Sequence, residues 1–455
     1  MDSNKEKPLV SDDQLIEERK KQVKVFIVKN WHYLQYILLL VIVWVGAYIR
    51  AQPLKNLIDN TTGKYISLEL DSTLFLRYAK YIAEHGRLFD VDPMRFYPLG
   101  GDIGGVGVYI SYFVAHLYKF LHFFIPSMTV EYADIIYPII ATAILTVFLF
   151  LLVRRIFNWK VGLLSALFIN IIPSFLFRSL GGSSDHDILA AMFIIMAFYF
   201  YVVGWHSDKL WKTVSFGIIT AIATILARES AGAGNFVYLI LGSFVTIEIF
   251  LNKLEKKDVY LYSTWLITAT ILNIYLYGFN NGFVIFVSSL TMGITYLALL
   301  FIIAEYIVFK INLKKHFSRI KLPESVISII ITLISGSIIV LIFFGTDFFI
   351  GKFEQLYNLM FKFYAATRWT LTVAENHRPY VTDWFGQMGK LFVYTMIIGS
   401  VALFYNMIKV FKNNKTLYFL STCYTLFIIG YIFSRYSSNS VFNGTSSISR
   451  LVFFG

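Results

Sequence analysis

The sequence has little charge and almost no cysteine for a chain of its length. Only 15% of its 455 residues are charged, whereas 57% are hydrophobic; a soluble globular protein has roughly 25% charged and 45–50% apolar residues. The single cysteine, Cys423, excludes an intramolecular disulfide and a metal cage built from cysteines. The composition also excludes disordered and collagen-like chains. It is typical of a multi-pass membrane protein, because apolar helices satisfy their own backbone hydrogen bonds in lipid.

Eleven apolar runs are long enough to cross a bilayer. The first 30 residues are too long and too charged for the start of a cleavable signal peptide, so we predict a cytoplasmic tail at 1–30 and a multi-pass transmembrane domain at 31–455. The first run, 31–49, is predicted to be a retained signal anchor. The other runs are 132–153, 161–178, 187–205, 213–228, 235–251, 260–278, 283–309, 326–345, 391–408 and 416–434.

The apolar stretch at 107–125 decides the orientation of every later helix. It carries His116, Lys119 and His122 on a repeating face, which is typical of an amphipathic helix at the membrane surface. If it does not cross, the inner loops hold 16 Lys and Arg against three acids, as the positive-inside rule requires. These loops are 154–160, 206–212, 252–258, 310–321 and 409–415. We therefore predict that 107–125 lies on the outer surface.

Two long segments and one short turn then lie on the outer side. The long segments are 50–131 and 346–390, and the turn is 179–186. The second long segment has no obvious regular structure, which is unusual for a loop of this length unless it acts as a lid or a binding loop. The chain stops at Gly455, a few residues into a new apolar stretch. We therefore expect a truncated last span, as in a fragment or one half of a split protein.

The strongest polar cluster is FRSLGGSSDHD, which contains Arg178, Asp185 and Asp187. Two carboxylates at i and i+2, after a flexible Gly-Gly pair, can supply the oxygen ligands that Mg²⁺ and Mn²⁺ prefer. A solvated helix cap is an equal alternative, because Ser184 or Asp185 could cap the helix that follows. By the same reasoning His186 is more often a bystander than a ligand.

Each outer segment contributes further acidic residues. Glu69 and Asp71 immediately precede an amphipathic helix, where an N-cap is the simpler explanation. In the second segment, Glu375 lies between Arg368 and Arg378 on an aromatic-rich stretch. This stretch fits a binding loop or a surface loop held on the bilayer by its tryptophans. No HExxH, Walker-type or Ser-His-Asp grouping is present, so none of those reaction classes is indicated.

Taken together, four segments resemble the catalytic subunit of oligosaccharyltransferase, the membrane enzyme of N-glycosylation, especially in its archaeal form. They occur in the family's order and cover essentially the whole chain. The segments are Glu69-Leu70-Asp71, Arg178 with the Asp185–Asp187 pair, TVAE at 372–375, and Ser449-Arg450-Leu451. The resemblance implies an all-α, polytopic fold of the GT-C glycosyltransferase type, with about 11 complete transmembrane helices.

The resemblance also implies a role for each matched residue. Asp71 would bind the metal and touch the acceptor asparagine, and Asp185 and Asp187 would complete the metal site. Glu375 would orient the acceptor amide, and Asp71 and Glu375 would thus be the catalytic pair. Two arginines are implied as well: Arg178 beside the acceptor peptide, and Arg450 on the phosphate of the lipid carrier.

The implied reaction is a metal-dependent, inverting transfer of an oligosaccharide from a polyprenyl (dolichyl) phosphate or diphosphate to the asparagine of Asn-X-Ser/Thr. Its cofactor would be Mn²⁺ or Mg²⁺. Its partners would be the lipid-linked oligosaccharide, the acceptor polypeptide, the lipid bilayer and a separately encoded C-terminal domain, with no nucleic acid. The expected location is the cell membrane, with the active site facing outside.

Two departures from the family keep other interpretations open. The C-terminal soluble domain with its WWDYG motif is absent from the sequence, and SAGAG at 230–234 replaces a Trp-Gly-Gly-type stretch. The alternatives are another polyprenyl-phosphate-sugar glycosyltransferase and an inactive fragment or split half of an oligosaccharyltransferase. A protein of a different class, a membrane transporter, would place such charged groups near the bilayer midplane and often shows repeated halves.

Overall fold

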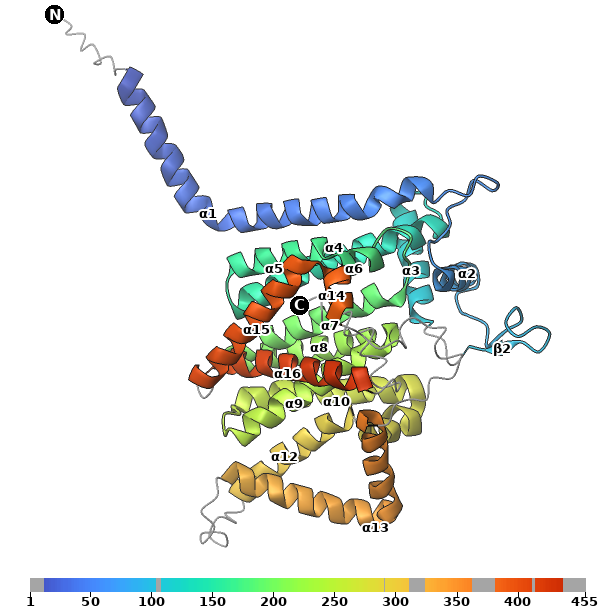
Figure 1. Cartoon of the computed structure of the whole chain (residues 1–455), viewed down its shortest axis with the longest axis vertical. Helices are drawn as coiled ribbons and strands as arrows, with labels where there is room; N and C mark the ends of the chain where they lie inside the picture. Colours follow the sequence, from blue (N-terminus) through green and yellow to red (C-terminus); the bar gives the residue numbers. More distant parts are fainter. Residues whose placement is uncertain are drawn as a thin grey trace, which may run out of the picture.

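A bundle of long helices dominates the computed structural model, which describes residues 12–103, 108–289, 291–310, 324–361, 381–410 and 414–436. Its helices run roughly side by side across Figure 1. The long ones are α1 (Asp12–Ala51), α4 (Val130–Ile156), α7 (His186–Trp205), α8 (Leu210–Ser230), α9 (Asn235–Phe250), α10 (Lys256–Phe279), α15 (Lys390–Val410) and α16 (Lys415–Tyr436).

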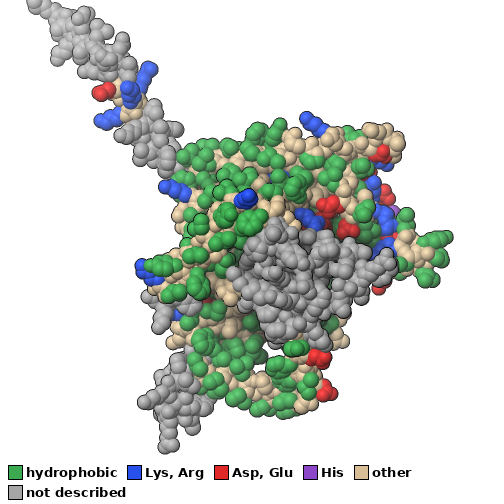
Figure 2. Space-filling view, viewed as in Figure 1, with side chains coloured by type: hydrophobic (Ala, Val, Ile, Leu, Met, Phe, Trp, Pro, Cys, Tyr) green, Lys and Arg blue, Asp and Glu red, His purple; other side chains and the backbone are tan. Residues whose placement is uncertain are grey.

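Seven helices within the described ranges are long and apolar enough to cross a membrane, and three shorter apolar helices accompany them. Large hydrophobic side chains remain exposed on the flanks of the bundle, including Trp44 at 64% and Ile271 at 60%, and Figure 2 shows hydrophobic groups over much of this surface. Such a surface suits lipid rather than water. The chain is a membrane protein, and the number of eleven spans stays a prediction.

Two of the predicted spans are interrupted. The run at 161–178 divides into α5 (Trp159–Ile171) and α6 (Pro173–Arg178), because proline has no N–H to continue a helix and fits best at its first position. The run at 283–309 divides into a short π-helix, η3 (Asn280–Val284), then α11 (Ile285–Ser288) and α12 (Gly293–Lys310).

The second outer segment is more regular than predicted. The helix α13 (Glu324–Phe361) bends at Gly345, whose φ of 74° suits glycine, and then continues as a second arm, as Figure 1 shows. A further helix, α14, covers Val381–Met388. The prediction of no regular structure over 346–390 is therefore wrong for 346–361 and 381–388, because the helix resumes after the glycine bend.

The first outer segment covers one end of the bundle. It contains the 3₁₀-helix η1 (Gln52–Asn56), α2 (Leu70–His85), the strands β1 (Val91–Asp92) and β2 (Gly101–Asp102), and α3 (Tyr109–Phe124). The two strands pair antiparallel, a small exception to the all-α prediction. The helix α3 is not among the candidate spans. Its Ile110, Val114 and Ala115 are buried while His116 is exposed, as the amphipathic pattern predicts.

The main core lies between α7, α8, α9 and α10, where aromatic side chains such as Trp265 and Tyr201 are almost fully buried. At one end of this core lie α2 and α3. The connections α4–α5 and α9–α10, which belong to the predicted basic loops, lie at the opposite end in Figure 1. The core thus separates the first outer segment, with α2 and α3, from the basic connections.

Candidate active site

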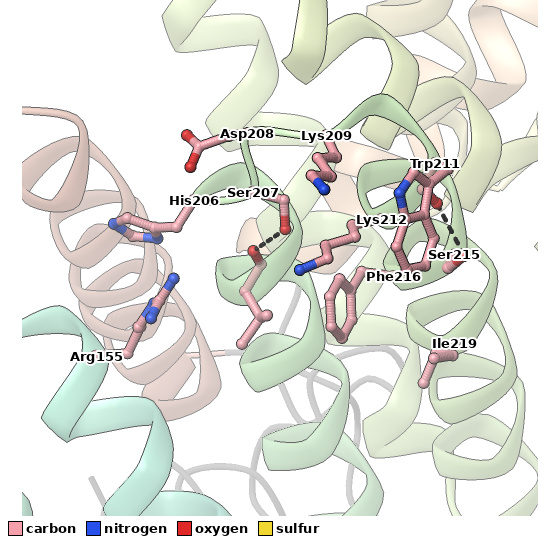
Figure 3. Close-up of a pocket in the computed structure, with 11 residues that line it drawn as sticks. Arg155, His206, Ser207, Asp208, Lys209, Trp211, Lys212, Ser215, Phe216 and Ile219 are labelled. Carbon is pink, nitrogen blue, oxygen red and sulfur yellow. Dashed lines mark hydrogen bonds between the residues drawn. The ribbon is translucent and has the colours of Figure 1, made fainter.

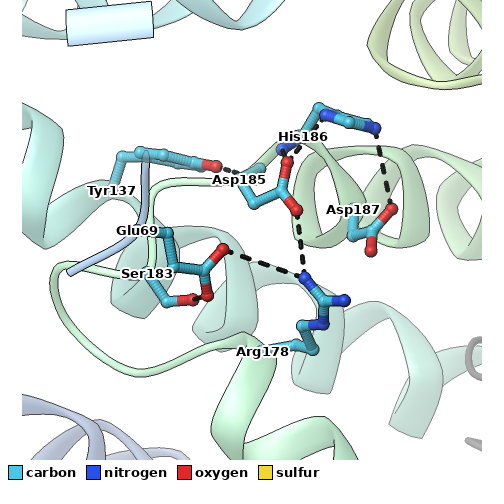
Figure 4. Close-up of polar contacts among 7 residues, drawn as sticks. All are labelled: Glu69, Tyr137, Arg178, Ser183, Asp185, His186 and Asp187. Atoms are coloured by element: carbon cyan, nitrogen blue, oxygen red, sulfur yellow. Dashed lines mark hydrogen bonds and ion pairs between the residues drawn. The ribbon is translucent and has the colours of Figure 1, made fainter. Parts of the chain in front are cut away.

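Two acidic segments that are distant in sequence meet at the α2 end of the bundle. The backbone N–H of Leu68 donates to the carbonyl of Gly182 over 2.8 Å, and the Ser183 hydroxyl donates to Glu69 Oε1. Figure 4 shows Glu69 beside the loop that carries Ser183 and Asp185. The structure therefore brings the Glu69-Leu70-Asp71 motif next to the Asp185–Asp187 motif.

The first turns of α4 hold both segments in place. The Asp134 side chain is fully buried and accepts a hydrogen bond of 2.7 Å from Ser67 through Oδ2. Its backbone carbonyl accepts a 2.8 Å bond from Ser184, and the Tyr137 hydroxyl donates to the carbonyl of Asp185. Sequence reasoning missed this role for Asp134, although an ionisable residue inside a predicted span is itself a functional signal.

Arg178 links the two acidic motifs. It is the last residue of α6, and its Nη1 lies 3.3 Å from Asp185 Oδ2 and 3.8 Å from Glu69 Oε2. Figure 4 shows the guanidinium between the two carboxylates. Because Asp185 is buried, this charge-assisted pair is stronger than a surface ion pair. Arg178 thus lies where the sequence places it, beside the acidic pair.

Asp185 caps α7 and also contacts His186. Its side chain accepts a 2.7 Å hydrogen bond from the His186 backbone N–H, as the capping alternative predicts. The ring Nδ1 of His186 lies 2.7 Å from Asp185 Oδ1, and Nε2 lies 3.9 Å from Asp187 Oδ1. Burial raises the pKa of the Asp185 carboxyl, but hydrogen bonds from His186 and the charge of Arg178 hold that pKa below its usual range.

Asp71 lies in the first turn of α2, where its side chain is exposed. It is close enough to His186 to interact with it electrostatically. Asp71, Asp185 and Asp187 carry the hard oxygen donors that a divalent cation prefers. As the side chains are placed, however, no group of three or more His, Cys, Asp or Glu in the described ranges lies close enough together to hold a metal ion.

A fully buried arginine supports the loop that follows α6. Arg50 Nε donates to Ser179 Oγ over 2.8 Å, and its Nη1 donates to Asn170 Oδ1 over 3.0 Å. The carbonyl of Arg50 accepts a 2.8 Å bond from Gly181 N–H. Arg50 therefore fixes both the side chain and the backbone at the start of the 179–186 turn. It was not among the predicted site residues, because it lies just beyond the predicted first span.

Glu375 and Arg450 lie outside the described residues, so their predicted roles stay predictions. The helix that follows the TVAE segment is described. Met388 of α14 packs with Ile172 and Val393 in a small hydrophobic cluster, and α14 contacts α6, the helix that ends at Arg178. The second outer segment is thus anchored beside the helix that presents Arg178.

Arg228 and Glu229, at the end of α8, pair with each other. Arg228 Nη1 lies 3.1 Å from Glu229 Oε1 and donates a 3.0 Å bond to Asn273 Oδ1. The guanidinium also lies 4.2 Å from the ring centre of Phe286. These contacts give the pair a structural role at the junction of α8 and α10.

Comparison with known proteins finds similar sequences over most of the chain. Residues 36–382 match the family described as "Oligosaccharyl transferase STT3, N-terminal". A dolichyl-phosphooligosaccharide-protein glycotransferase 1 from Pyrococcus furiosus is 26% identical over 386 residues, which cover 81% of this chain and 36% of that protein. A rice dolichyl-diphosphooligosaccharide–protein glycosyltransferase subunit STT3A is 24% identical over 217 residues, which cover 46% of this chain and 27% of that protein.

Solved structures share the fold. The oligosaccharyltransferase AglB from Archaeoglobus fulgidus, in complex with an inhibitory peptide and a dolichol-phosphate, superposes with a TM-score of 0.70 at 17% identity. The match covers 92% of this chain and 50% of that one. A second structure from the same organism, with Zn and sulfate, has a TM-score of 0.63 at 17% identity and covers 91% and 48% of the two chains. The chain thus spans about half the length of these proteins, and about a third of the Pyrococcus furiosus relative.

Proposed function

Because the chain belongs to the oligosaccharyl transferase STT3 family, we propose that it is the membrane catalytic part of a protein N-glycosylation enzyme. It transfers an oligosaccharide from a polyprenyl phosphate or diphosphate to the asparagine amide of Asn-X-Ser/Thr. One observation carries the proposal: Glu69, from the first outer segment, meets Arg178 and Asp185, from the α6–α7 segment, at the end of the bundle. A water-borne polypeptide and a lipid-linked sugar can meet only at such an end.

Known structures support the two substrates. The Archaeoglobus fulgidus protein has been solved with a dolichol-phosphate and an inhibitory peptide, and also tethered to an acceptor peptide that contains the NVT sequon. We propose that the corresponding end of this chain, which holds Asp71 and Arg178, binds the acceptor peptide. Arg178 would hold the two acidic motifs close together through its ion pairs and would present a positive charge to the peptide.

We propose that Asp71, Asp185 and Asp187 hold a divalent cation, Mn²⁺ or Mg²⁺. The neighbouring structure with Zn and sulfate supports the use of a divalent metal in this fold. When bound, the ion would supply positive charge against the anionic phosphate that leaves the sugar. Arg450, at the beginning of a late apolar stretch, would add a second positive charge at that phosphate.

The acceptor amide needs help to act as a nucleophile, because its nitrogen lone pair is delocalised into the carbonyl. In our proposal Asp71 and Glu375 accept hydrogen bonds from its two N–H groups, and this orients and polarises the amide without full deprotonation. Attack on the anomeric carbon, opposite the phosphate, forms the new C–N bond as the C–O bond to phosphate breaks. The sugar configuration inverts, and the amide proton passes to a carboxylate.

The chain length between Glu375 and α14 is compatible with this role. Glu375 precedes the start of α14 at Val381 by six residues, which span at most about 20 Å when extended, and α14 packs on α6. A tether of this length would let Glu375 reach the end of the bundle where Arg178 lies, as the proposed role requires.

The arrangement favours an enzyme over a transporter. A transporter usually places its charged substrate site near the bilayer midplane, within broken helices. Here Asp185 is the N-cap of α7 and Arg178 is the last residue of α6. Both therefore lie at helix ends, where an external polypeptide has access.

The direct test is transfer by the purified chain in lipid vesicles, with a polyprenyl-linked glycan, an Asn-X-Thr peptide and Mn²⁺ or Mg²⁺. We expect glycopeptide formation that stops when a chelator is added and that is abolished by Asp71→Asn. The control is Asp208→Asn, because Asp208 is also exposed but lies in the α7–α8 connection at the other end. Equal activity of Asp71→Asn and the control would overturn the proposed site.

A further inference from the structure

A cavity of about 600 Å³ lies at the end of the bundle opposite the candidate active site. It is formed by the last turn of α4, the end of α7 and the first turns of α8. Its volume lies within the range of about 300–1,000 Å³ that is typical of small-ligand sites. None of the acidic motifs described above contributes to it.

Three cationic side chains surround the cavity. Arg155 comes from α4, while Lys209 and Lys212 come from the beginning of α8. Figure 3 shows the end groups of Arg155 and Lys212 directed toward the space between them, with Asp208 turned away. Within the described ranges, no ion pair joins any of these three cations to an acid. The cavity therefore has an excess of positive charge.

Other neighbours do not offset this charge. Burial lowers the pKa of His206, and the nearby charges of Arg155, Lys257 and Lys415 lower it further. His206 is accordingly neutral near pH 7, and both its ring nitrogens are used: Nδ1 contacts the Val202 carbonyl and Nε2 accepts from Trp205. The positive field at this end thus comes from lysine and arginine alone.

The remaining wall is apolar and extends into a candidate span. Phe216 and Ile219 line the cavity one and two turns further along α8 than Lys212, so Ile219 lies about 10 Å deeper along the helix axis. Trp211 lies at the beginning of the same helix and is 64% exposed, at the level where tryptophan marks a membrane interface. The cavity is thus cationic at its opening and apolar along the wall that extends toward the bilayer.

We propose that this cavity binds an anionic phospholipid, with the phosphate among Arg155, Lys209 and Lys212 and an acyl chain along Phe216 and Ile219. The cationic opening together with the apolar wall favours a lipid over a free phosphate ion, because a free ion makes no contact with apolar side chains that would stabilise it. Basic residues at the end of a span attract anionic lipid headgroups in the same way at other membrane proteins.

The test is lipid binding by the full chain in a zwitterionic detergent, counted by native mass spectrometry with phosphatidylglycerol as the probe. Each Lys near an anionic headgroup contributes about 1 kcal/mol, so Lys209→Gln/Lys212→Gln is expected to weaken binding about 10- to 30-fold. The matched control is Lys253→Gln/Lys256→Gln, which removes two exposed lysines from the next basic loop, outside the cavity. It is expected to change binding less than about twofold.

Three outcomes would overturn the proposal. Equal losses in the two double variants would show attraction by net charge alone. Phosphatidylcholine binding as tightly as phosphatidylglycerol would show that the cations do not select the headgroup. Displacement of the lipid by millimolar inorganic phosphate would assign the cavity to a free ion. If the double variant does not purify as a monodisperse protein, Lys212→Gln against Lys256→Gln makes the same comparison, with an expected loss of about fivefold.

Discussion

Replacing Asp92 with Asn tests how firmly the first outer segment is held over the bundle. The Asp92 side chain is fully buried and pairs with Arg77, through Oδ1 at 3.0 Å from Nη1 and through a second, closer contact. It also accepts 2.8 Å and 2.9 Å bonds from the Tyr78 hydroxyl and the Met94 N–H. Asp92 thereby ties β1 to α2, the helix that carries Asp71.

The expected cost of Asp92→Asn follows from these contacts. Asparagine keeps an oxygen for Tyr78 or Met94 but loses the charge that Arg77 pairs with. A charge-assisted hydrogen bond contributes about 1.5–3 kcal/mol, and Arg77 is 32% exposed, which screens part of it. We expect the stability of this segment to fall by about 2 kcal/mol, corresponding to roughly a 30-fold rise in local opening.

Limited proteolysis of the membrane-embedded chain measures this opening, because the 86–103 connection becomes cleavable when it leaves the bundle. The matched control is Asp90→Asn, an exposed acid two residues away, which is expected to leave cleavage unchanged. Equal protection of Asp92→Asn and wild-type protein would refute the reasoning.

The same contact predicts a pH dependence of stability. Burial raises the pKa of Asp92, but the hydrogen bonds from Arg77, Met94 and Tyr78 outweigh it, so the pKa is lowered to about 2. A carboxyl whose pKa is lower in the folded state stabilises the fold above its unfolded pKa of about 4. This contribution is lost as the pH falls from about 4 to about 2, and Asp92→Asn is expected to abolish that part of the acid sensitivity in the proteolysis assay.

Three other changes probe separate parts of the molecule. Arg178→Gln leaves Glu69 and the buried Asp185 without their shared cation, so we expect loss of oligosaccharide transfer to the peptide, with the detergent-solubilised protein still monodisperse on size-exclusion chromatography. Unchanged transfer would remove Arg178 from the site. Arg50→Lys removes the guanidinium group that donates hydrogen bonds to both Ser179 and Asn170. We expect slower oligosaccharide transfer together with faster proteolysis of the 179–186 turn. Lys415→Met leaves Glu248 and Asp258 buried without their cation, so we expect the free energy of unfolding to fall by about 3–5 kcal/mol. The measurement is the thermal unfolding transition, which should move to a lower temperature. Lys409→Met, at the exposed end of α15, is the control and should leave the transition unchanged.

Much of the fold was predictable from local pattern. The apolar runs correspond to described helices, because a stretch of that length and composition is stable in lipid only as a helix. Lys and Arg counts predicted that 107–125 lies on the outer surface and does not cross the membrane. The helix α3 is not among the candidate spans and lies at one end of the bundle (Figure 1), while the side of the membrane stays a prediction. Breaks within the apolar runs were only partly predictable. Pro173 marks one break in the sequence itself, whereas the bend at Gly345 depends on a φ value that the sequence does not specify.

The candidate site was predictable as a set of residues but not as a set of contacts. Arg178, Asp185 and the Glu69 motif were found from sequence, and the structure joins them. Two supporting residues were missed. Asp134 and Arg50 lie within or at the edge of apolar helices, and only the packing of α4 and α6 shows that their polar groups hold the acidic loops.

The sequence by itself determined that this is a helical membrane protein, which connections carry positive charge, and which residues are candidates for the chemistry. Hydrophobic length and charge counts are properties of short stretches, so they need no knowledge of distant contacts. Only the tertiary structure decided that Ser183 bonds Glu69 across 114 residues of chain and that a basic cavity opens at the far end. Those features depend on which helices pack together, and that is set by the fit of many side chains at once rather than by any local pattern.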